Sequence, residues 1–335
     1  MSRSPGKISF VIPVFNRREE VEELLASMSA QTRGGFEVVL VEDGSTDKSD
    51  EVAARYADRL DVKYFFKPNS GPGQSRNYGF ERASGDYCIF LDSDCVLPPG
   101  YFTVVSDALN AQYLDAFGGP DRAHEDFTVV QKAINYAMTS TFTTGGIRGS
   151  SEKLEKFHPR SFNMGYSREV FEKTGGFSKL RFGEDIDMSI RIHRAGFSTG
   201  LIREAYVYHK RRATFRQFFK QVFNSGIARI NLYKAHPGSL KAVHFAPAIF
   251  TLGVVGAFVF SLLFSSWFLL IPVGYALALF IDATLKTKSL GIGLLATAAS
   301  FVMLFGYGTG FLTAFWKRIV LGRDVYSAFE KTFYE

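Results

Sequence analysis

Cysteine is nearly absent from the sequence, since Cys88 and Cys95 are the two thiols in 335 residues. This shortage excludes a disulfide-stapled scaffold, and the six scattered histidines add no zinc-ligand spacing. The segment GPGQSRN at 71–77 lacks the Lys-Ser/Thr ending of a P-loop and the third glycine of a dinucleotide fingerprint. These absences exclude several common signatures of hydrolases and nucleotide-binding proteins.

Charge is missing from two long stretches, residues 245–281 and 289–316. Each is long enough to supply membrane helices. As one helix the first stretch would measure about 55 Å, which exceeds a hydrocarbon core of about 30 Å. We therefore expect two short helices that turn near Ser265 and Ser266, with Pro272 able to kink the second. The predicted membrane region is 244–316, with hydrophobic segments at 245–264, 267–285 and 289–316.

Acidic residues are scarce between Arg203 and Lys241, where nine basic residues stand against one acid, Glu204. The net charge of this block is +8, although the whole chain carries +6. The block directly precedes the first uncharged stretch, the position at which cytosolic basic residues flank a membrane span. Anionic head groups of membrane lipids are therefore its expected partner, and adjacency to a span favours them over nucleic acid.

The first residues, MSRSPGKISFVIPVFN, have no signal-peptide pattern, because their apolar run is short and leads straight into a polar turn. We therefore expect the amino-terminal two-thirds to stay in the cytosol, with the chain anchored as a multi-pass protein of the inner (plasma) membrane. In the segment 213–243, phenylalanines interleave with Arg216, Lys220 and Arg229, which suits a helix at 214–233 in the membrane interface. A surface helix docked on the globular domain is the alternative.

The last uncharged stretch leaves two topologies open. A third crossing would place Lys317, Arg318 and Arg323, in the predicted basic tail 317–335, outside the cell and against the positive-inside trend. A kinked or partly interfacial segment would keep that tail in the cytosol.

The first hundred residues alternate strand and helix patterns, which predicts an α/β fold with a mainly parallel sheet and helices on both faces. The expected strands are 8–12, 36–42, 61–66 and 87–91, and the expected helices are 18–30, 47–60 with Asp47 as N-cap, and 73–83. Beyond residue 100 we expect helices at 164–176 and 184–194 and a strand at 198–208 that leads into His209. These elements make up a predicted first domain at 1–212.

Polar residues follow the predicted strands at one edge of the sheet, where α/β proteins bind their ligands. They are Asn16, Asp43, Asp92 and Asp94. Asp92 and Asp94 stand two apart after an apolar strand, so both carboxylates can converge on one hard cation. Mg²⁺ and Mn²⁺ are typically held by one or two carboxylates together with substrate phosphates. Taken alone, an acid pair of this kind is equally explained as a cap or a turn.

A second acidic cluster, Glu184-Asp185-Ile186-Asp187, opens the predicted helix at 184–194. Acids in a first helical turn are ordinary, because the helix dipole favours them. Taken alone, this cluster therefore needs no catalytic explanation.

Taken together and in order, the motifs resemble glycosyltransferase family 2, the inverting enzymes with a Rossmann-like GT-A fold. The resemblance covers about residues 8–210. The matching segments are FVIPVFN (10–16), VEDGSTD (41–47), NSGPGQSRNYG (69–79), FLDSDCVLPPGYF (90–102), SFNMGYSREVFEKTGGF (161–177) and FGEDIDMSIRIHRAGF (182–197).

The resemblance implies a nucleotide-diphosphate sugar as donor and a role for each matching residue in holding it. Pro13 and the turn that carries Asn16 would line the nucleotide base, and Asp43 would accept a hydrogen bond from it. Arg76 would contact the base or the diphosphate, since a guanidinium suits phosphate oxygens.

The resemblance also implies a divalent ion, Mn²⁺ or Mg²⁺. Asp94 would ligate this ion and Asp92 would hold the ribose or water around it. His209 would add a metal or diphosphate contact, with a structural histidine as the alternative. Glu184 would help to bind the nucleotide sugar, and Asp185 would be the general base that deprotonates the acceptor hydroxyl.

The resemblance thus predicts transfer of one sugar, with inversion, to a hydroxyl of a glycan or lipid-linked glycan in surface polysaccharide or oligosaccharide assembly. Gln217 and Gln221 are not followed by the Arg-Trp pair of the Q-x-x-R-W motif that processive members carry. A polyprenyl-phosphate glycosyltransferase is the alternative within this class, although members of that kind tend to lack the Gly-Glu-Asp helix found here. A non-catalytic nucleotide- or glycan-binding membrane protein is the alternative outside it.

Overall fold

The computed structural model describes residues 3–122, 127–144 and 158–329, and the chain divides into two compact units. The first unit contains Met1–His124 and Leu154–Lys210, and the second contains Glu125–Lys153 and Arg211–Glu335. The predicted first domain ran without a break from 1 to 212, whereas the structure assigns 125–153 to the second unit. The reason is helix α5 (Val129–Thr139), which buries Ala133, Ile134 and Ala137 among the other helices of the second unit.

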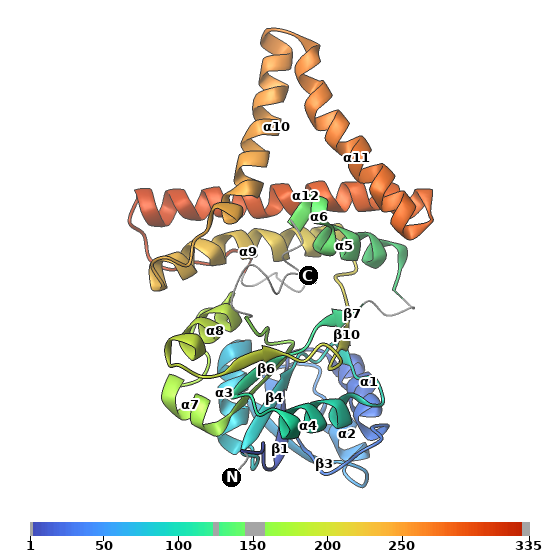
Figure 1. Cartoon of the computed structure of the whole chain (residues 1–335), viewed down its shortest axis with the longest axis vertical. Coiled ribbons are helices and arrows are strands. Elements are labelled where there is room, and N and C mark those ends of the chain that lie inside the picture. The colour runs from blue at the N-terminus through green and yellow to red at the C-terminus, as the bar shows by residue number, and fades with distance from the viewer. Residues whose placement is uncertain (1–2, 123–126, 145–157, 330–335) are drawn as a thin grey trace. The chain divides into compact units, whose positions relative to one another are not determined.

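The first unit is built on a seven-stranded sheet. Its strands, in order across the sheet, are β3 (Asp61–Lys67), β2 (Glu37–Asp43), β1 (Ile8–Val14), β4 (Tyr87–Leu91), β8 (Asn163–Ser167), β6 (Ala116–Gly118) and β9 (Thr199–Leu201). Strands β3, β2, β1 and β4 run parallel, and β8 is antiparallel to both of its neighbours. The prediction of a mainly parallel α/β sheet is therefore confirmed (Figure 1).

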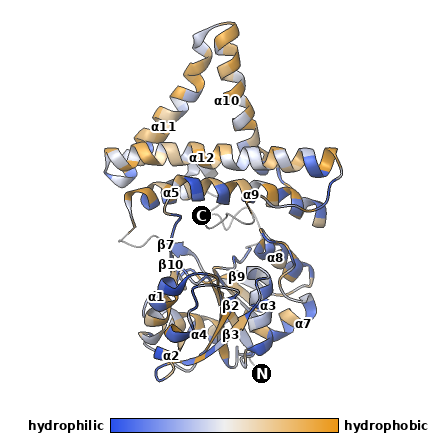
Figure 2. Cartoon of the chain, turned by 180° about the vertical axis from the view of Figure 1, so that it is seen from behind, coloured by the Kyte–Doolittle hydropathy of each residue, from blue (hydrophilic) through white to orange (hydrophobic). Residues whose placement is uncertain are grey.

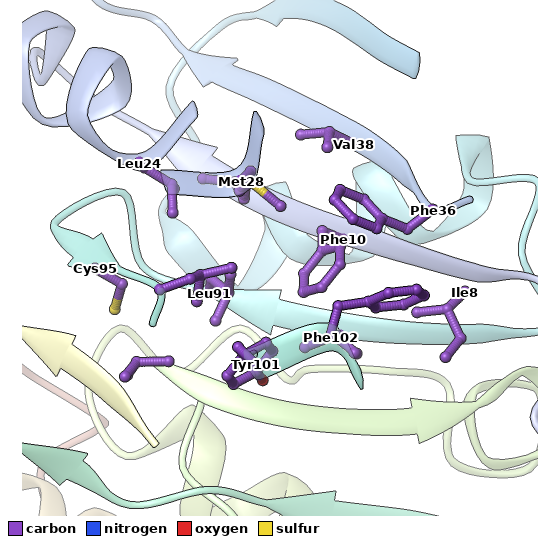
Figure 3. Packing of buried hydrophobic residues seen from close by; sticks show 14 of the residues in the cluster. Ile8, Phe10, Leu24, Met28, Phe36, Val38, Leu91, Cys95, Tyr101 and Phe102 are labelled. Carbon is purple, nitrogen blue, oxygen red and sulfur yellow. The ribbon is translucent and has the colours of Figure 1, made fainter. Parts of the chain in front are cut away.

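Helices cover both faces of this sheet. They are α1 (Arg18–Ser29), α2 (Asp50–Arg55), α3 (Pro72–Arg82), α4 (Tyr101–Ala111), α7 (Arg168–Thr174) and α8 (Glu184–Arg194). Side chains alternate along a strand, so Phe10 and Ile12 of β1 pack with α1 and α4 while Val11 packs on the opposite face with α3. Figure 3 shows the first of these cores, where the Phe10 and Phe36 rings meet edge to face at 5.1 Å.

Three local predictions are wrong, each for a tertiary reason. Helix α2 begins at Asp50 rather than Asp47, because the buried Glu42 carboxylate accepts hydrogen bonds from the Ser49 amide and hydroxyl and holds 45–49 as a loop. The predicted helix 164–176 is strand β8 followed by α7, because residues 163–167 pair with β4. The predicted strand 198–208 is two short strands, β9 and β10 (Val207–His209), which belong to different sheets.

A second sheet of three short strands contains β10 between β5 (Cys95–Val96) and β7 (Asp121–Arg122). In the antiparallel β5–β10 pair, His209 stands opposite Cys95 and Tyr208 opposite Val96. This register carries His209 to the loop that follows β4, the position of Asp92 and Asp94.

The second unit is helical. Its longer helices are α5, α9 (Phe215–Ala235), α10 (Ala246–Leu263), α11 (Leu270–Thr287) and α12 (Leu290–Ala314), and it also contains the short α6 (Thr141–Thr144) and a π-helical turn at Phe315–Val320. The turn predicted near Ser265 and Ser266 is present between α10 and α11. Pro272 lies in the first turn of α11, where its missing N–H needs no partner. The last six residues of the predicted tail 317–335 lie outside the described residues.

Three helical segments of the second unit are long and apolar enough to cross a membrane: Ala242–Leu263, Ser266–Thr287 and Leu290–Val320. Figure 2 shows these helices mainly in orange and white, whereas the first unit carries much more of the hydrophilic blue. Large apolar side chains such as Leu262, Trp267 and Ile271 are more than 70% exposed in this unit. These helices are suited to anchoring the chain in a membrane.

Glycines let α12 approach its neighbours closely. A Cβ atom placed on Gly310 would lie 2.1 Å from the carbonyl oxygen of Phe223 in α9, and one on Gly308 would lie 2.4 Å from the carbonyl oxygen of Pro247 in α10. Gly253 of α10 has no atom of the described residues within 4 Å of the corresponding position. The glycines of α12 are therefore required by packing, whereas Gly253 is not.

We expect Gly310→Ala to lower the melting temperature of the detergent-solubilised chain, because the new methyl group meets backbone that cannot rotate away. Overpacking of this kind costs about 1–3 kcal/mol. Gly253→Ala is the matched control and should leave the melting temperature unchanged or raise it, since alanine favours helix by up to about 1 kcal/mol. Equal melting temperatures for the two variants would show that α9 and α12 are not in close contact.

Candidate active site

The carboxyl ends of β1, β2 and β4 lie at one edge of the sheet, and the predicted site residues follow them. Asn16 comes after β1, Asp43 ends β2, and Asp92 and Asp94 come after β4. Strand β8 is antiparallel to β4 with Asn163 opposite Leu91, so the start of β8 lies at this edge as well. The structure thus brings the sequence motifs together at the edge where parallel sheets bind ligands.

Asp94 and His209 place two possible metal ligands side by side at this edge. The Nε2 atom of His209 lies 3.1 Å from Oδ1 of Asp94 and 3.8 Å from Oδ2 of Asp92. The His209 ring stacks on Phe162, with their centroids 5.0 Å apart, and this contact holds the imidazole facing the acids. A carboxylate oxygen and an imidazole nitrogen at this spacing suit a divalent ion.

Cys95 also lies beside this pair, with its sulfur within 4.8 Å of the ligand atoms of Asp94 and His209. Its thiol is fully buried and lies 3.5 Å from the Phe162 carbonyl oxygen, to which it donates. Burial first, and then the negative charges of Asp94 and Asp92, raise the pKa of Cys95 well above its ordinary value. A neutral thiol is a poor ligand, so Asp94 and His209 are the better donor set.

Arg76 of α3 connects the acids after β4 with the start of α8. Arg76 is 2% exposed, and its guanidinium donates to Oδ1 of Asp92 at 2.6 Å and to Oε1 of Glu184 at 3.1 Å. The ring of Phe177 covers it at 5.4 Å. The family resemblance implied that Arg76 contacts the base or the diphosphate of the nucleotide sugar. In the structure Arg76 forms a bridge between two carboxylates of the protein itself.

The acids at the start of α8 point to three different partners. Gly183 precedes the helix with φ +82°, a left-handed conformation that glycine adopts without strain. Glu184 then meets Arg76, Asp185 accepts from Arg160 Nε at 2.5 Å, and Asp187 pairs with Arg191 at 2.7 Å. Successive residues of a helix are about 100° apart, which is why the three acids separate.

The pKa values of the neighbouring acids Glu184 and Asp185 are shifted in opposite directions. Burial, together with the charge of Asp185, raises the pKa of Glu184 to about 7. Burial acts in the same direction on Asp185, but the Arg160 guanidinium and the Ile186 amide outweigh it and lower the pKa of Asp185 below its ordinary value. Asp185 is therefore the acid that remains ionised at neutral pH.

The residues implied to hold the nucleotide base are engaged with the protein itself. Asp43 is 3% exposed, accepts from the Ser70 and Gly71 amides at 2.8 and 2.9 Å, and pairs with Lys67. Asn16 has φ +51°, and its side-chain oxygen accepts from the Thr46 and Asp47 amides. Pro13 pairs with Val41 within the sheet. These contacts shape the loops at the edge, and a carboxylate with about four acceptor positions keeps capacity for a further donor.

Arg160 and Phe162 are the site residues that sequence reasoning missed. Arg160 directly precedes the motif SFNMGYSREVFEKTGGF (161–177) and Phe162 is its second residue, so the motif was the available signal. Their partners, Asp185 and His209, stand 25 and 47 positions further along the chain, and no local pattern indicates such contacts.

A sequence model of glycosyl transferase family 2 matches residues 9–175. An uncharacterized glycosyltransferase of Rickettsia conorii is 44% identical over 88 residues, which is 26% of this chain and 15% of that protein. A GalNAc(5)-diNAcBac-PP-undecaprenol beta-1,3-glucosyltransferase of Campylobacter jejuni is 24% identical over 242 residues, 70% of this chain and 72% of that one. The chain thus covers well under two-thirds of the Rickettsia relative.

Among solved structures, a mannosyltransferase from Pyrobaculum calidifontis in complex with GDP-Man and Mn²⁺ has a similar architecture. The likeness has a TM-score of 0.57 at 17% sequence identity and covers 93% of this chain and 88% of that one. At this identity the likeness concerns the fold alone, and the first unit of this chain has the GT-A fold.

We expect Arg76→Met to destabilise the protein strongly, because it leaves Asp92 and Glu184 without their shared cation. Removing one partner of a buried ion pair costs about 3–5 kcal/mol. Arg82→Met is the matched control on the same helix, since the Arg82 side chain is 36% exposed and such exposed pairs contribute about 0–1 kcal/mol. The melting temperatures of the two variants check this, and equal values would contradict the bridging role.

Proposed function

We propose, on the premise that residues 9–175 form a glycosyl transferase family 2 domain, that this membrane-associated protein is an inverting glycosyltransferase. It transfers one sugar from a nucleotide-diphosphate sugar to a hydroxyl group of a glycan acceptor. The observation that carries the proposal is the convergence of two groups at one sheet edge. The Asp94–His209 pair can hold a cation, Asp185 is an ionised carboxylate, and Arg76 connects the two ends through Asp92 and Glu184.

Asp94 and His209, with Asp92 beside them, are the residues that would hold a divalent ion. Their mixed oxygen and nitrogen donors fit Mn²⁺, and carboxylates with substrate phosphates fit Mg²⁺ as well. When bound, such an ion stabilises the negative charge that develops on the departing nucleoside diphosphate. The solved mannosyltransferase with GDP-Man and Mn²⁺, which shares the fold, supports the proposal.

Asp185 is the proposed general base. It takes the proton from the acceptor hydroxyl while that oxygen forms its bond to the anomeric carbon and the bond to the diphosphate breaks. A single displacement with one base inverts the configuration at that carbon. Arg160 lowers the pKa of Asp185 and so keeps its carboxylate ionised. The same contact weakens Asp185 as a base until the hydroxyl of the bound glycan competes with Arg160 for the carboxylate.

A lipid-linked glycan is the proposed acceptor. The Campylobacter relative acts, by its name, on an oligosaccharide attached to undecaprenyl diphosphate, and the match covers 70% of this chain. The three apolar helical segments would keep the protein at the membrane where such an acceptor resides. Assembly of surface polysaccharide or lipid-linked oligosaccharide is therefore the proposed setting.

Asp94→Asn is expected to weaken donor binding in Mn²⁺ at least tenfold, because the amide does not compensate the charge of the ion. The donor is the nucleotide sugar that gives the largest thermal stabilisation in a screen with Mn²⁺. Calorimetry compares the wild type, Asp94→Asn and Asp107→Asn, an exposed acid of α4 that serves as the control. Equal wild-type affinity in Mn²⁺ and in EDTA would overturn the metal assignment.

Asp185→Asn is expected to lower kcat by roughly 10²–10⁴-fold with little change in donor affinity, because it removes the proton acceptor and keeps the shape. Asp187→Asn is the matched control on the same helix and should stay within a few-fold of the wild type, since Asp187 pairs with Arg191. Near-normal turnover of Asp185→Asn with both substrates saturating would falsify the assignment.

The pH dependence of kcat distinguishes Asp185 from Glu184. A base works when it has lost its proton, so turnover falls as the pH drops through the pKa of that base. With Asp185 as base, the lowered pKa keeps turnover high at pH 6 and 5, and Arg160→Gln should shift the acid limb to higher pH. A limb near pH 7 that disappears in Glu184→Gln would instead identify Glu184 as the base.

A further inference from the structure

Helix α12 packs along α9, which carries the cationic side chains Arg216, Lys220, Arg229 and Lys234. The contact continues along both helices in the same direction. A Cβ atom on Gly306 would lie 2.5 Å from Cγ2 of Val222, and one on Gly226 would lie 2.2 Å from the Tyr307 carbonyl oxygen. Past the end of α12, Arg318 donates to Oδ1 of Asn231 at 2.7 Å. If one of the two helices enters a membrane, the other must therefore enter it to the same depth.

This contact decides whether α12 can cross a bilayer. If α12 spanned the hydrocarbon core, α9 would enter the core beside it with four cations and the buried amides of Asn224 and Asn231. Charged side chains at the centre of a bilayer are costly and rare in membrane helices. An amphipathic helix rich in basic and phenylalanine residues belongs at the membrane surface. Helix α12 must lie there with it.

Helices α10 and α11 differ from α12 in what surrounds them. In the most apolar 18-residue stretch of each segment, the buried share is 17% for the segment that contains α10, 11% for that of α11 and 33% for that of α12. Exposed apolar side chains occur around both α10 and α11, including Leu262, Leu263, Ile271 and Val273. A helix that is apolar on all sides and unburied is suited to lipid.

The start of α10 and the end of α11 both contact α12. Gly308 lies against Pro247 and Thr251 in the first turns of α10, and Gly293 lies against Thr284 near the end of α11. Fifteen residues of helix separate the two glycines, about 22 Å along α12. Figure 1 shows α10 and α11 as two legs that rise from the line of α12, with α9 and α5 beside it.

Basic residues stand before α10, at the junction of α11 and α12, and after α12. Lys241 precedes the hairpin, Lys286 lies in the last turn of α11 and Lys288 directly follows it, and Lys317 and Arg323 follow α12. The tip of the hairpin, FSSWF at 264–268, carries no charge. Basic residues are retained on one side of a membrane, so both ends of α12 belong to that side.

We propose that α10 and α11 form a hairpin that enters the lipid bilayer from one side, and that α12 lies with α9 along the surface at that side. The bilayer is the partner of this surface: acyl chains surround the hairpin, and anionic head groups meet Arg216, Arg229 and Lys234, the basic residues of α9 that are not buried. The chain is then on one side of the membrane at 235–241, at 286–289 and at 317–324. This arrangement is independent of the proposed transfer reaction.

Cysteine accessibility in the full-length chain tests the arrangement. The wild type is the background control, because Cys88 and Cys95 are buried and should not react. Single cysteines are placed at exposed positions by Ala235→Cys, Lys288→Cys, Asp324→Cys and Phe264→Cys. Each variant is treated with a membrane-impermeant maleimide in right-side-out vesicles, in inside-out vesicles and in detergent.

We expect the first three variants to be labelled from one and the same face, with at least tenfold preference over the other. Phe264→Cys, at the hairpin tip, should not be labelled from that face. Labelling of Asp324→Cys from the face opposite to Lys288→Cys would mean that α12 crosses, and would overturn the proposal. Labelling of Asp324→Cys after detergent alone would mean that the end of α12 is not at the membrane surface, and would also overturn it. Labelling of Phe264→Cys from the same face as the others would also overturn it. A variant that does not accumulate is replaced by Lys286→Cys or Arg323→Cys.

Discussion

One buried cation organises the candidate active site. The guanidinium of Arg76 lies between Asp92, which follows β4, and Glu184, which opens α8, and it is almost inaccessible to water. Buried charges require partners in good geometry, so this contact ties three elements, β4, α3 and α8, to fixed positions relative to one another. The pair Asp94–His209 and the acid Asp185 are held at two ends of that arrangement because Arg76 holds the middle.

The same bridge separates the roles of neighbouring acids. Glu184 is turned toward Arg76 in a dry environment and has a raised pKa, whereas Asp185, about 100° further round the helix, meets Arg160 and has a lowered pKa. The pKa values of two adjacent carboxyl groups are thereby shifted in opposite directions by their surroundings alone. Environments that push the pKa values of two carboxyl groups apart are common where one site carries out acid–base chemistry, which supports the proposed role of Asp185.

In the second unit a different constraint decides the arrangement. Glycines in α12 allow backbone contact with α9, and the basic and amide side chains of α9 forbid a deep position in lipid. Hydropathy by itself marks three equivalent apolar segments, because it averages over a window and contains no information on what lies beside each helix. Packing distinguishes the hairpin of α10 and α11, which is open to lipid, from α12, of which a larger share is buried against other helices.

The sequence by itself determined the features that have a local cause. Short apolar runs and helical apolar patterns placed β1, β2, β3, β4, α1 and α3, and the bounds of α8 were predicted as observed. The acids after β4 were identified because strand, turn and carboxylates are contiguous. Only the tertiary structure decided the pairing of β8 with β4, the register that carries His209 to Asp94, the Arg160 contact with Asp185 and the transfer of α5 to the second unit. Each joins residues far apart in sequence, and their free energy depends on partners that no local pattern specifies.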